Sequence, residues 1–150
     1  MRRRNPKPIL LISIVLLIVI SGFIAYQFTP SVQAKKIVQD FYSYEQSGDF
    51  DDSWELLHPQ IMDRLDKFTY LETRSKMLLL SFDVNTFSYE VGHANKMKNW
   101  AFEKNGNSFD VVYEFPVTLA YESKFGNFTI QQKVYVTMEE DEWRILWDYK

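Results

Sequence analysis

Apolar residues divide the chain into one uninterrupted run and a longer, patterned region. Residues 9–26, ILLISIVLLIVISGFIAY, contain no charged side chain, and a helix of this length extends about 27 Å, close to the thickness of the hydrocarbon core of a bilayer. With Gln27 and Phe28, this run predicts a transmembrane helix at residues 9–28. The charged residues before it are all basic: Arg2, Arg3, Arg4 and Lys7. The positive-inside rule therefore predicts a single-pass protein of the cytoplasmic membrane, with residues 1–8 inside and residues 29–150 as an extracytoplasmic domain.

A cleaved signal peptide is the alternative interpretation of the same run. Val32, Gln33 and Ala34 fit the small-residue pattern that precedes a cleavage site. The apolar stretch is longer than the usual core of a signal peptide, however, and cleavage after Ala34 would remove the first turn of the helix that follows. We therefore prefer an uncleaved anchor, and the sequence leaves cleavage open.

Helical periodicity begins directly after the apolar run. Thr29, Pro30 and Ser31 end the membrane helix and offer a hydroxyl group to cap the next one. Steps of three and four residues then define a predicted buried stripe: Ala34, Ile37, Val38, Phe41, Tyr42 and Glu45. Further helical faces are predicted at Phe50, Trp54 and Leu57, and, after Pro59, at Ile61, Met62 and Leu65.

A capping-box pattern predicts one more helix. Thr69 and Glu72 have the spacing of the box. The residues that follow at helical spacing, and that we expect to be buried, are Leu71, Ser75, Leu78 and Leu79.

Beyond Leu80 the period of the apolar residues changes from 3.6 to about 2. The clearest alternation predicts one long strand with Phe109, Val111, Tyr113, Phe115, Val117, Leu119 and Tyr121 on one face. Pro116 lies inside this strand, and because proline cannot donate to a β-ladder, we expect a bulge or bend there. Later strands are predicted after the Gly126-Asn127 turn and around Trp143 to Tyr149, and weaker ones around Phe87 to Val91 and Trp100 to Phe102, the latter before an Asn105-Gly106 turn.

Helices followed by antiparallel strands predict an α+β fold. We expect a cone-shaped domain in which about three helices pack on the concave face of a bent antiparallel sheet. The chain is 46% hydrophobic and 17% aromatic, which is enough for one sizeable core. It contains no cysteine, so disulfides, thiol chemistry and cysteine-ligated zinc are excluded.

The helical and strand segments together resemble a known superfamily. Residues 30–57, PSVQAKKIVQDFYSYEQSGDFDDSWELL, look like the opening helices of nuclear transport factor 2-like proteins. Residues 142–148, EWRILWD, are similar to the W-x-[IV]-x-W-[DS] close of the amino-terminal domain of class B penicillin-binding proteins of the methicillin-resistance type. The resemblance covers about residues 30–148 and implies a non-catalytic cone. Two departures are that Tyr149 replaces the usual proline, and that those proteins continue into a transpeptidase domain.

Charge is distributed unevenly along the chain. Residues 29–150 contain 13 basic and 20 acidic side chains, so the predicted domain carries a formal charge of −7. An acidic domain without a basic stripe offers no surface for phosphate backbones, so we expect no nucleic-acid partner.

Few residues are candidates for chemistry. Asp49, Asp51 and Asp52 can ligate a hard cation, but aspartates at a turn and in a first helical turn are explained by capping and the helix dipole. His58 and His93 lie in no motif, and we expect both at the surface, where the His58 imidazole either caps the helix after it or lies in solvent. The sequence therefore predicts no catalytic residue, no metal and no cofactor.

Two residue pairs are the remaining site candidates. Tyr113 and Gln132 are the polar groups expected to face the interior, so they are the candidate pocket, although a register shift or a position at the sheet edge explains Gln132 more simply. Trp147 and Tyr149 are the candidate interaction surface, and core closure is an equal alternative for both. Trp143, on the same strand face, is expected in the core.

These features predict a membrane-anchored, non-catalytic interaction or scaffold module of the bacterial cell envelope. We expect a bilayer contact through residues 9–28 and a partner that is an envelope protein or the cell wall, in peptidoglycan synthesis or in a transport or conjugation assembly. The alternative is a small-molecule binder or enzyme that uses the interior of the cone. An inert spacer is a third hypothesis.

Overall fold

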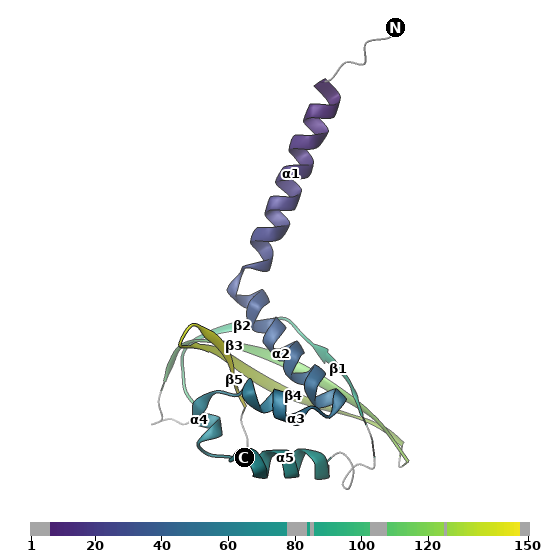
Figure 1. Ribbon diagram of the computed structural model, residues 1–150, viewed down its shortest axis with the longest axis vertical. Coiled ribbons are helices and arrows are strands. Elements are labelled where there is room, and N and C mark those ends of the chain that lie inside the picture. Colours follow the sequence, from purple (N-terminus) through teal and green to yellow (C-terminus); the bar gives the residue numbers. More distant parts are fainter. Residues whose placement is uncertain (1–6, 78–83, 85, 103–107, 125, 148–150) are drawn as a thin grey trace.

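A long helix joins a body of four shorter helices and a curled antiparallel sheet in the computed structural model, which describes residues 7–77, 84, 86–102, 108–124 and 126–147 (Figure 1). The helices are α1 (Lys7–Gln27), α2 (Pro30–Ser47), α3 (Phe50–Glu55), α4 (Pro59–Met62) and α5 (Lys67–Lys76). The strands are β1 (Ser88–Val91), β2 (Asn95–Trp100), β3 (Phe109–Ser123), β4 (Gly126–Glu139) and β5 (Glu142–Leu146). The predicted α+β class, with helices first and antiparallel strands second, is confirmed.

The junction between α1 and α2 is a sharp elbow. Pro30 occupies the first turn of α2, where its missing N–H is not needed. Thr29 precedes it, but its hydroxyl donates to the carbonyl of Tyr26 at 2.8 Å and makes no cap bond to α2, so the expected hydroxyl cap is wrong. In the part of the chain that the structure describes, no single helix is long and apolar enough to cross a membrane, whereas residues 11–27 and α2 pass that test together, bent by 61°.

The predicted stripe of α2 lies against the sheet. Its fully buried members are Ala34, Val38, Phe41, Tyr42 and Glu45. Gly48 ends the helix with a positive φ of 85°, and its N–H donates to the carbonyl of Tyr44. Such a left-handed residue is the usual way to close a helix, and glycine adopts it without steric cost.

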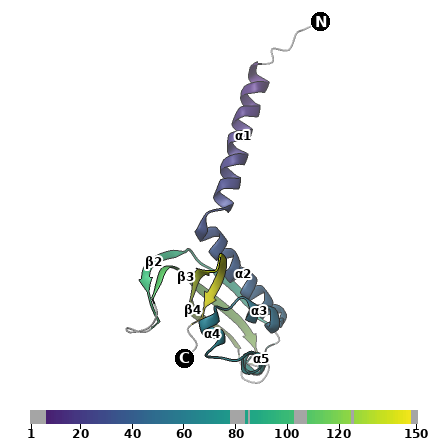
Figure 2. The ribbon, with the colours of Figure 1, turned by 60° about the vertical axis from the view of Figure 1, so that its left-hand side comes forward.

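The sheet has the order β1-β3-β4-β5, and β2 pairs with the first half of β3. All pairings are antiparallel, with Tyr113 opposite Val136 and Val136 opposite Ile145. β1 and β2 follow one another along the same edge of β3. Figure 2 shows α2, α3 and α5 on one side of the curled sheet, with β2 leaning out on the other.

Pro116 does not interrupt the long strand. Its position in β3 is paired with Lys133 of β4 in an unbroken register, so no bulge lies in this ladder. On the other edge of β3, the three residues between Val91 and Asn95 lie opposite only two, so the expected irregularity occurs there. The reason is the edge that Pro116 faces. Its carbonyl accepts from the N–H of Gly92 at 2.8 Å, at the point where β1 has ended and β2 has not begun, so no ladder bond requires an N–H there. A Cβ on Gly92 would lie 2.7 Å from the Pro116 ring, so only glycine fits this crossing.

α5 begins earlier and buries a different face than the capping box predicted. Asp66 is its N-cap, and the Asp66 side chain accepts from the N–H of Thr69 at 3.0 Å. The buried residues are Tyr70 and Arg74, whereas Leu71 is only half-buried. Leu78 and Leu79, and the Asn105-Gly106 turn, lie outside the described residues.

The outer edge of β5 is covered by the segment between α3 and α4. Leu57 forms a parallel bridge with Ile145, and the N–H of Ile145 donates to the carbonyl of Leu56 at 2.9 Å. The N–H of His58 donates back to the carbonyl of Ile145 at 2.8 Å. This pairing satisfies an edge that would otherwise be open and carries the chain around the end of the sheet.

Candidate functional site

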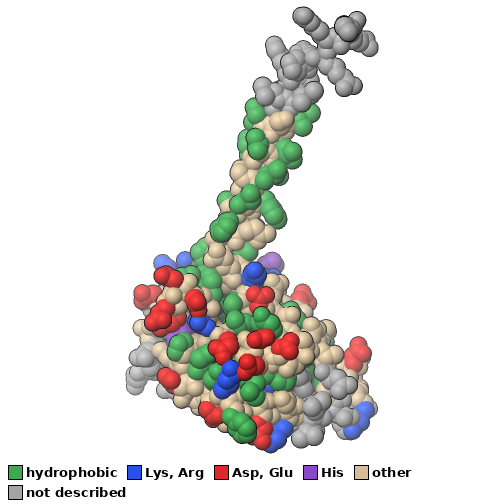
Figure 3. All heavy atoms as spheres, in the orientation of Figure 1, with side chains coloured by type: hydrophobic (Ala, Val, Ile, Leu, Met, Phe, Trp, Pro, Cys, Tyr) green, Lys and Arg blue, Asp and Glu red, His purple; other side chains and the backbone are tan. Residues whose placement is uncertain are grey.

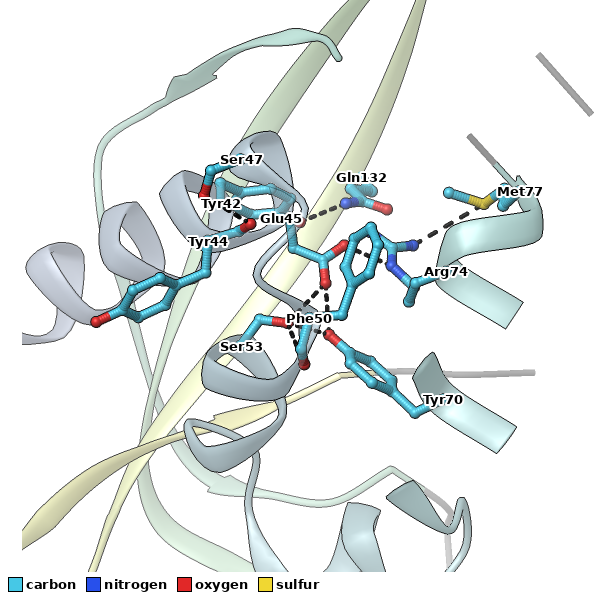
Figure 4. Close-up of polar contacts among 10 residues, drawn as sticks. All are labelled: Tyr42, Tyr44, Glu45, Ser47, Phe50, Ser53, Tyr70, Arg74, Met77 and Gln132. Carbon is cyan, nitrogen blue, oxygen red and sulfur yellow. Dashed lines mark hydrogen bonds and ion pairs between the residues drawn. The ribbon is translucent and has the colours of Figure 1, made fainter. Parts of the chain in front are cut away.

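A buried carboxylate, Glu45, is the centre of the polar groups inside the domain (Figure 4). It comes from the last turns of α2 and is fully buried. Tyr70 donates to Glu45 Oε1 at 2.6 Å, and Ser53 of α3 donates to the same oxygen at 2.8 Å. Glu45 Oε2 accepts from Arg74 of α5 and forms an ion pair with its guanidinium. Both oxygens are thus held by partners from two other helices.

The charge of Arg74 is stabilised although the side chain is buried. Burial alone lowers the pKa of Arg74, but the negative charge of Glu45 and the hydrogen bond to it more than offset burial, so the pKa lies above its ordinary value. Burial raises the pKa of Tyr70 far above its ordinary value, and the charge of Glu45 raises it further. Tyr70 is therefore a neutral donor, not an acid or a base near neutral pH.

Trp147 covers this polar cluster. The guanidinium of Arg74 lies 5.0 Å from the centre of the Trp147 ring, in cation–π geometry. The same ring meets Tyr70 edge to face at 6.1 Å and lies 6.5 Å from Phe41. Trp147 is half-buried against the core and follows the end of β5 at Leu146. Trp147 thus packs against the core, which was one of the two expectations for it. Tyr149 lies outside the described residues.

The two candidate pocket residues are not brought together. The Gln132 amide donates to the Tyr42 hydroxyl, and burial raises the pKa of Tyr42 far above its ordinary range. Tyr113 is opposite Val136, four positions away from Gln132 along β4, and its ring meets Trp143 edge to face at 5.7 Å. Trp143 is half-buried at the core margin, and its indole N–H donates to Gln33 at 3.1 Å.

These contacts determine what the interior can do chemically. Glu45 has the burial expected of a general acid or base, but each of its oxygens already accepts from protein donors. Such a satisfied network holds helices in place, since a buried charge is tolerated only when it is paired. The helical periodicity of α2 predicts that Glu45 is buried but not which residues contact it, because the pattern after Thr69 predicts a buried face of α5 one position away from Tyr70 and Arg74. The four-residue spacing of those two residues was the available signal.

His58 is buried, with 2% of its surface exposed, so the expected surface position is wrong. Its Nδ1 accepts from the N–H of Gln60 at 3.1 Å and caps α4, which is one of the two expected roles. Its ring meets Phe109 edge to face at 5.2 Å, and Nε2 lies 3.4 Å from a carboxylate oxygen of Glu139. Burial lowers the pKa of His58, and Glu139 offsets this only in part.

The remaining candidates lie apart from one another. His93 is exposed, as expected, in the turn between β1 and β2. Asp51 forms an ion pair with Lys67 at 2.7 Å, and Asp49 accepts from Ser47. Within the described residues, no three histidine, aspartate or glutamate side chains are grouped so that they can hold a metal ion.

An open groove of about 440 Å³ lies at the elbow between α1 and α2. Tyr26 and Gln27 line it from the end of α1, and Lys35 and Lys36 line it from α2. His93 completes it from the β1–β2 turn. Figure 3 shows basic and histidine side chains at the top of the body, near this junction, and many acidic side chains beside and below them.

Comparison with known proteins does not add a relative. No model of a known protein family matches the chain. A search of curated proteins finds no significant match either.

Proposed function

We propose that this chain is a membrane-anchored, extracytoplasmic and non-catalytic interaction module of the bacterial cell envelope. The observation that carries the proposal is the surface of α1. Its large apolar side chains from Leu11 onward are exposed, by between 45% at Ile14 and Ile20 and 68% at Ile12, and Phe28 directly after it is 70% exposed. A patch of this size on a soluble surface is unfavourable, and a bilayer is the solvent that matches it.

The body does not need α1 for its own core. The earliest residue of the core cluster is Ala34, in α2. The helix therefore projects away from a body that is packed by its own side chains (Figure 1). A membrane anchor joined to an independently packed domain has this arrangement.

The orientation follows from charge. Arg2, Arg3, Arg4 and Lys7 precede the apolar run, and the run itself has no charge. Basic flanks stay on the cytoplasmic side, so the body faces outward.

Two features support a binding role without turnover. Glu45, the most deeply buried carboxylate among the described residues, accepts hydrogen bonds from Arg74, Tyr70 and Ser53, so its hydrogen-bonding capacity is used inside the fold. The α+β body, with helices on one face of a curled sheet, is also the architecture that the resemblance to nuclear transport factor 2-like domains implies. Within that resemblance the partner is an envelope protein or the cell wall, in peptidoglycan synthesis or in a transport or conjugation assembly.

Topology is tested by cysteine accessibility in intact cells, because the chain has no native cysteine. Thr129 is exposed on β4, so Thr129→Cys should react with a membrane-impermeant maleimide before the cells are opened. Asn5→Cys should react only after permeabilisation. Labelling of Asn5→Cys but not Thr129→Cys in intact cells would refute the proposed orientation. Release of the chain from membranes by alkaline carbonate would refute the anchor itself.

A further inference from the structure

The groove at the α1–α2 elbow is exceptional in charge for this domain. None of the residues that line it is acidic, although residues 29–150 carry a formal charge of −7. Lys35, Lys36 and His93 face it from two elements that are distant in sequence. Asp40, one turn after Lys36 on α2, does not line the groove. The local charge of the groove is therefore opposite to that of the body.

The two lysines are not neutralised by the surrounding protein. In the described part of the chain neither Lys35 nor Lys36 forms an ion pair, whereas Lys67, Lys76 and Lys133 do. The ammonium groups of these three lysines lie 2.6 to 3.1 Å from carboxylate oxygens. Two adjacent free ammonium groups at a concave surface attract an anion.

Polar donors accompany the charges. Gln33 also lines the groove, and its Oε1 accepts from the indole N–H of Trp143 at 3.1 Å. Because that oxygen is occupied, the amide NH₂ of Gln33 is the group left to donate. Lysine ammonium groups and amide donors together suit a phosphate, which offers several acceptor oxygens.

The position of the groove indicates which molecule would supply that phosphate. Tyr26 and Gln27 line it and are also the last residues of α1. If α1 is embedded as proposed, the end of the helix lies at the interface, where tyrosine is favoured and where the headgroups are. The groove then opens at the level of the lipid phosphates.

We infer that the elbow groove binds the phosphate of an anionic phospholipid in the outer leaflet and thereby holds the body against the membrane surface. This inference rests on the proposed anchoring by α1. It adds a second contact, through Lys35 and Lys36, to the hydrophobic one. Such a contact restricts the angle of the body relative to the bilayer.

The test uses the full chain in lipid nanodiscs, with one fluorophore on an introduced cysteine. Asn95→Cys places the label next to the groove without changing a lining residue, and Phe68→Cys places it on α5, at the other end of the body. Discs contain a headgroup-linked quencher and either phosphatidylcholine alone or added phosphatidylglycerol. We expect phosphatidylglycerol to increase quenching of the Asn95 label and to leave the Phe68 label unchanged.

A lysine substitution pair provides the specificity control. Lys35→Gln with Lys36→Gln should lower the ratio of bound to unbound bodies by about fivefold for each lysine, because each lysine near an anionic surface contributes to attraction. Lys76→Gln with Lys124→Gln removes the same charge from exposed positions on α5 and at the end of β3, and should have little effect. An equal decrease of the bound-to-unbound ratio in the two double variants would overturn the inference, because it would indicate general electrostatic attraction to the membrane and not binding in the groove.

Two further outcomes would also overturn the inference. If soluble glycerol phosphate, a phosphate monoester, abolishes the quenching at a concentration equal to that of the lipid phosphate, the groove prefers free phosphate esters to a lipid headgroup. If the chain resists alkaline extraction but phosphatidylglycerol does not change the Asn95 signal, the groove has no lipid contact while the anchor stands. Loss of the chain from the discs on alkaline extraction would instead count against the proposed function.

Discussion

Glu45 and Arg74 form an ion pair inside the domain, and Arg74 also lies over the ring of Trp147. The three residues belong to α2, to α5 and to the segment after β5. The pair therefore joins two helices to the last part of the sheet, across 29 residues of sequence from Glu45 to Arg74. Because both charges are buried, each is tolerated only in the presence of the other.

Replacing one member of this ion pair should destabilise the fold more than replacing both. We expect Glu45→Leu to lower the free energy of unfolding by about 3–5 kcal/mol, because it leaves the Arg74 charge buried and unpaired. Glu45→Leu with Arg74→Met should cost less than Glu45→Leu alone. Equilibrium unfolding in urea, followed by near-ultraviolet circular dichroism of the full chain in detergent, measures both. A loss below about 1 kcal/mol for Glu45→Leu would mean that the pair acts like an exposed one.

The pKa of His58 predicts a loss of stability on mild acidification. Burial holds this pKa below its ordinary value of about 6.5, so below that pH the unfolded chain binds a proton that the folded chain excludes. Stability is fully present above pH 6.5 or so and falls as the pH drops, by at most about 1.4 kcal/mol per pH unit from this group.

His58→Asn is the matched variant for this titration, since asparagine is also a good N-cap for α4. The variant should keep the cap on Gln60 and flatten the dependence of the unfolding midpoint on pH between about 5 and 7. Parallel pH profiles for the two proteins would show that His58 does not titrate differently in the folded state.

The hydrogen bond from Trp143 to Gln33 should couple the last strand to the first turns of α2. Trp143→Phe keeps an aromatic ring against Tyr113 but loses the indole N–H. A double-mutant cycle with Gln33→Leu should give a coupling of about 0.5–1.5 kcal/mol, the usual net value of one hydrogen bond. The measurement is the urea midpoint of the four proteins. Strictly additive effects would exclude the bond in solution.

Deleting residues 1–28 should yield a soluble domain that folds independently and is monomeric or weakly dimeric. The core cluster begins at Ala34, so the deletion removes none of its members. The near-ultraviolet circular dichroism of the fragment should match that of the full chain, and gel filtration should give a single species. Aggregation of the fragment would show that α1 contributes to folding of the body.

Local sequence patterns predict the features that depend on a single helix or strand. The stripe of α2, including Glu45, follows from steps of three and four residues, and the alternation from Phe109 to Tyr121 predicts β3. Each of these patterns reports which side chains share a face of one helix or strand. That is a property of backbone geometry, and it is the same whatever the element packs against.

Which distant residues those faces contact depends on the tertiary structure. His58 is buried because the chain beside it pairs with Ile145, 87 positions later, and this brings Phe109 and Glu139 to the imidazole. Arg74 is buried because Glu45 and Trp147 come to it from both directions along the sequence. The groove likewise brings together Lys35 and Lys36 with His93, which is distant from them in the sequence. Burial and pairing depend on contacts between distant segments, so no local period can encode them.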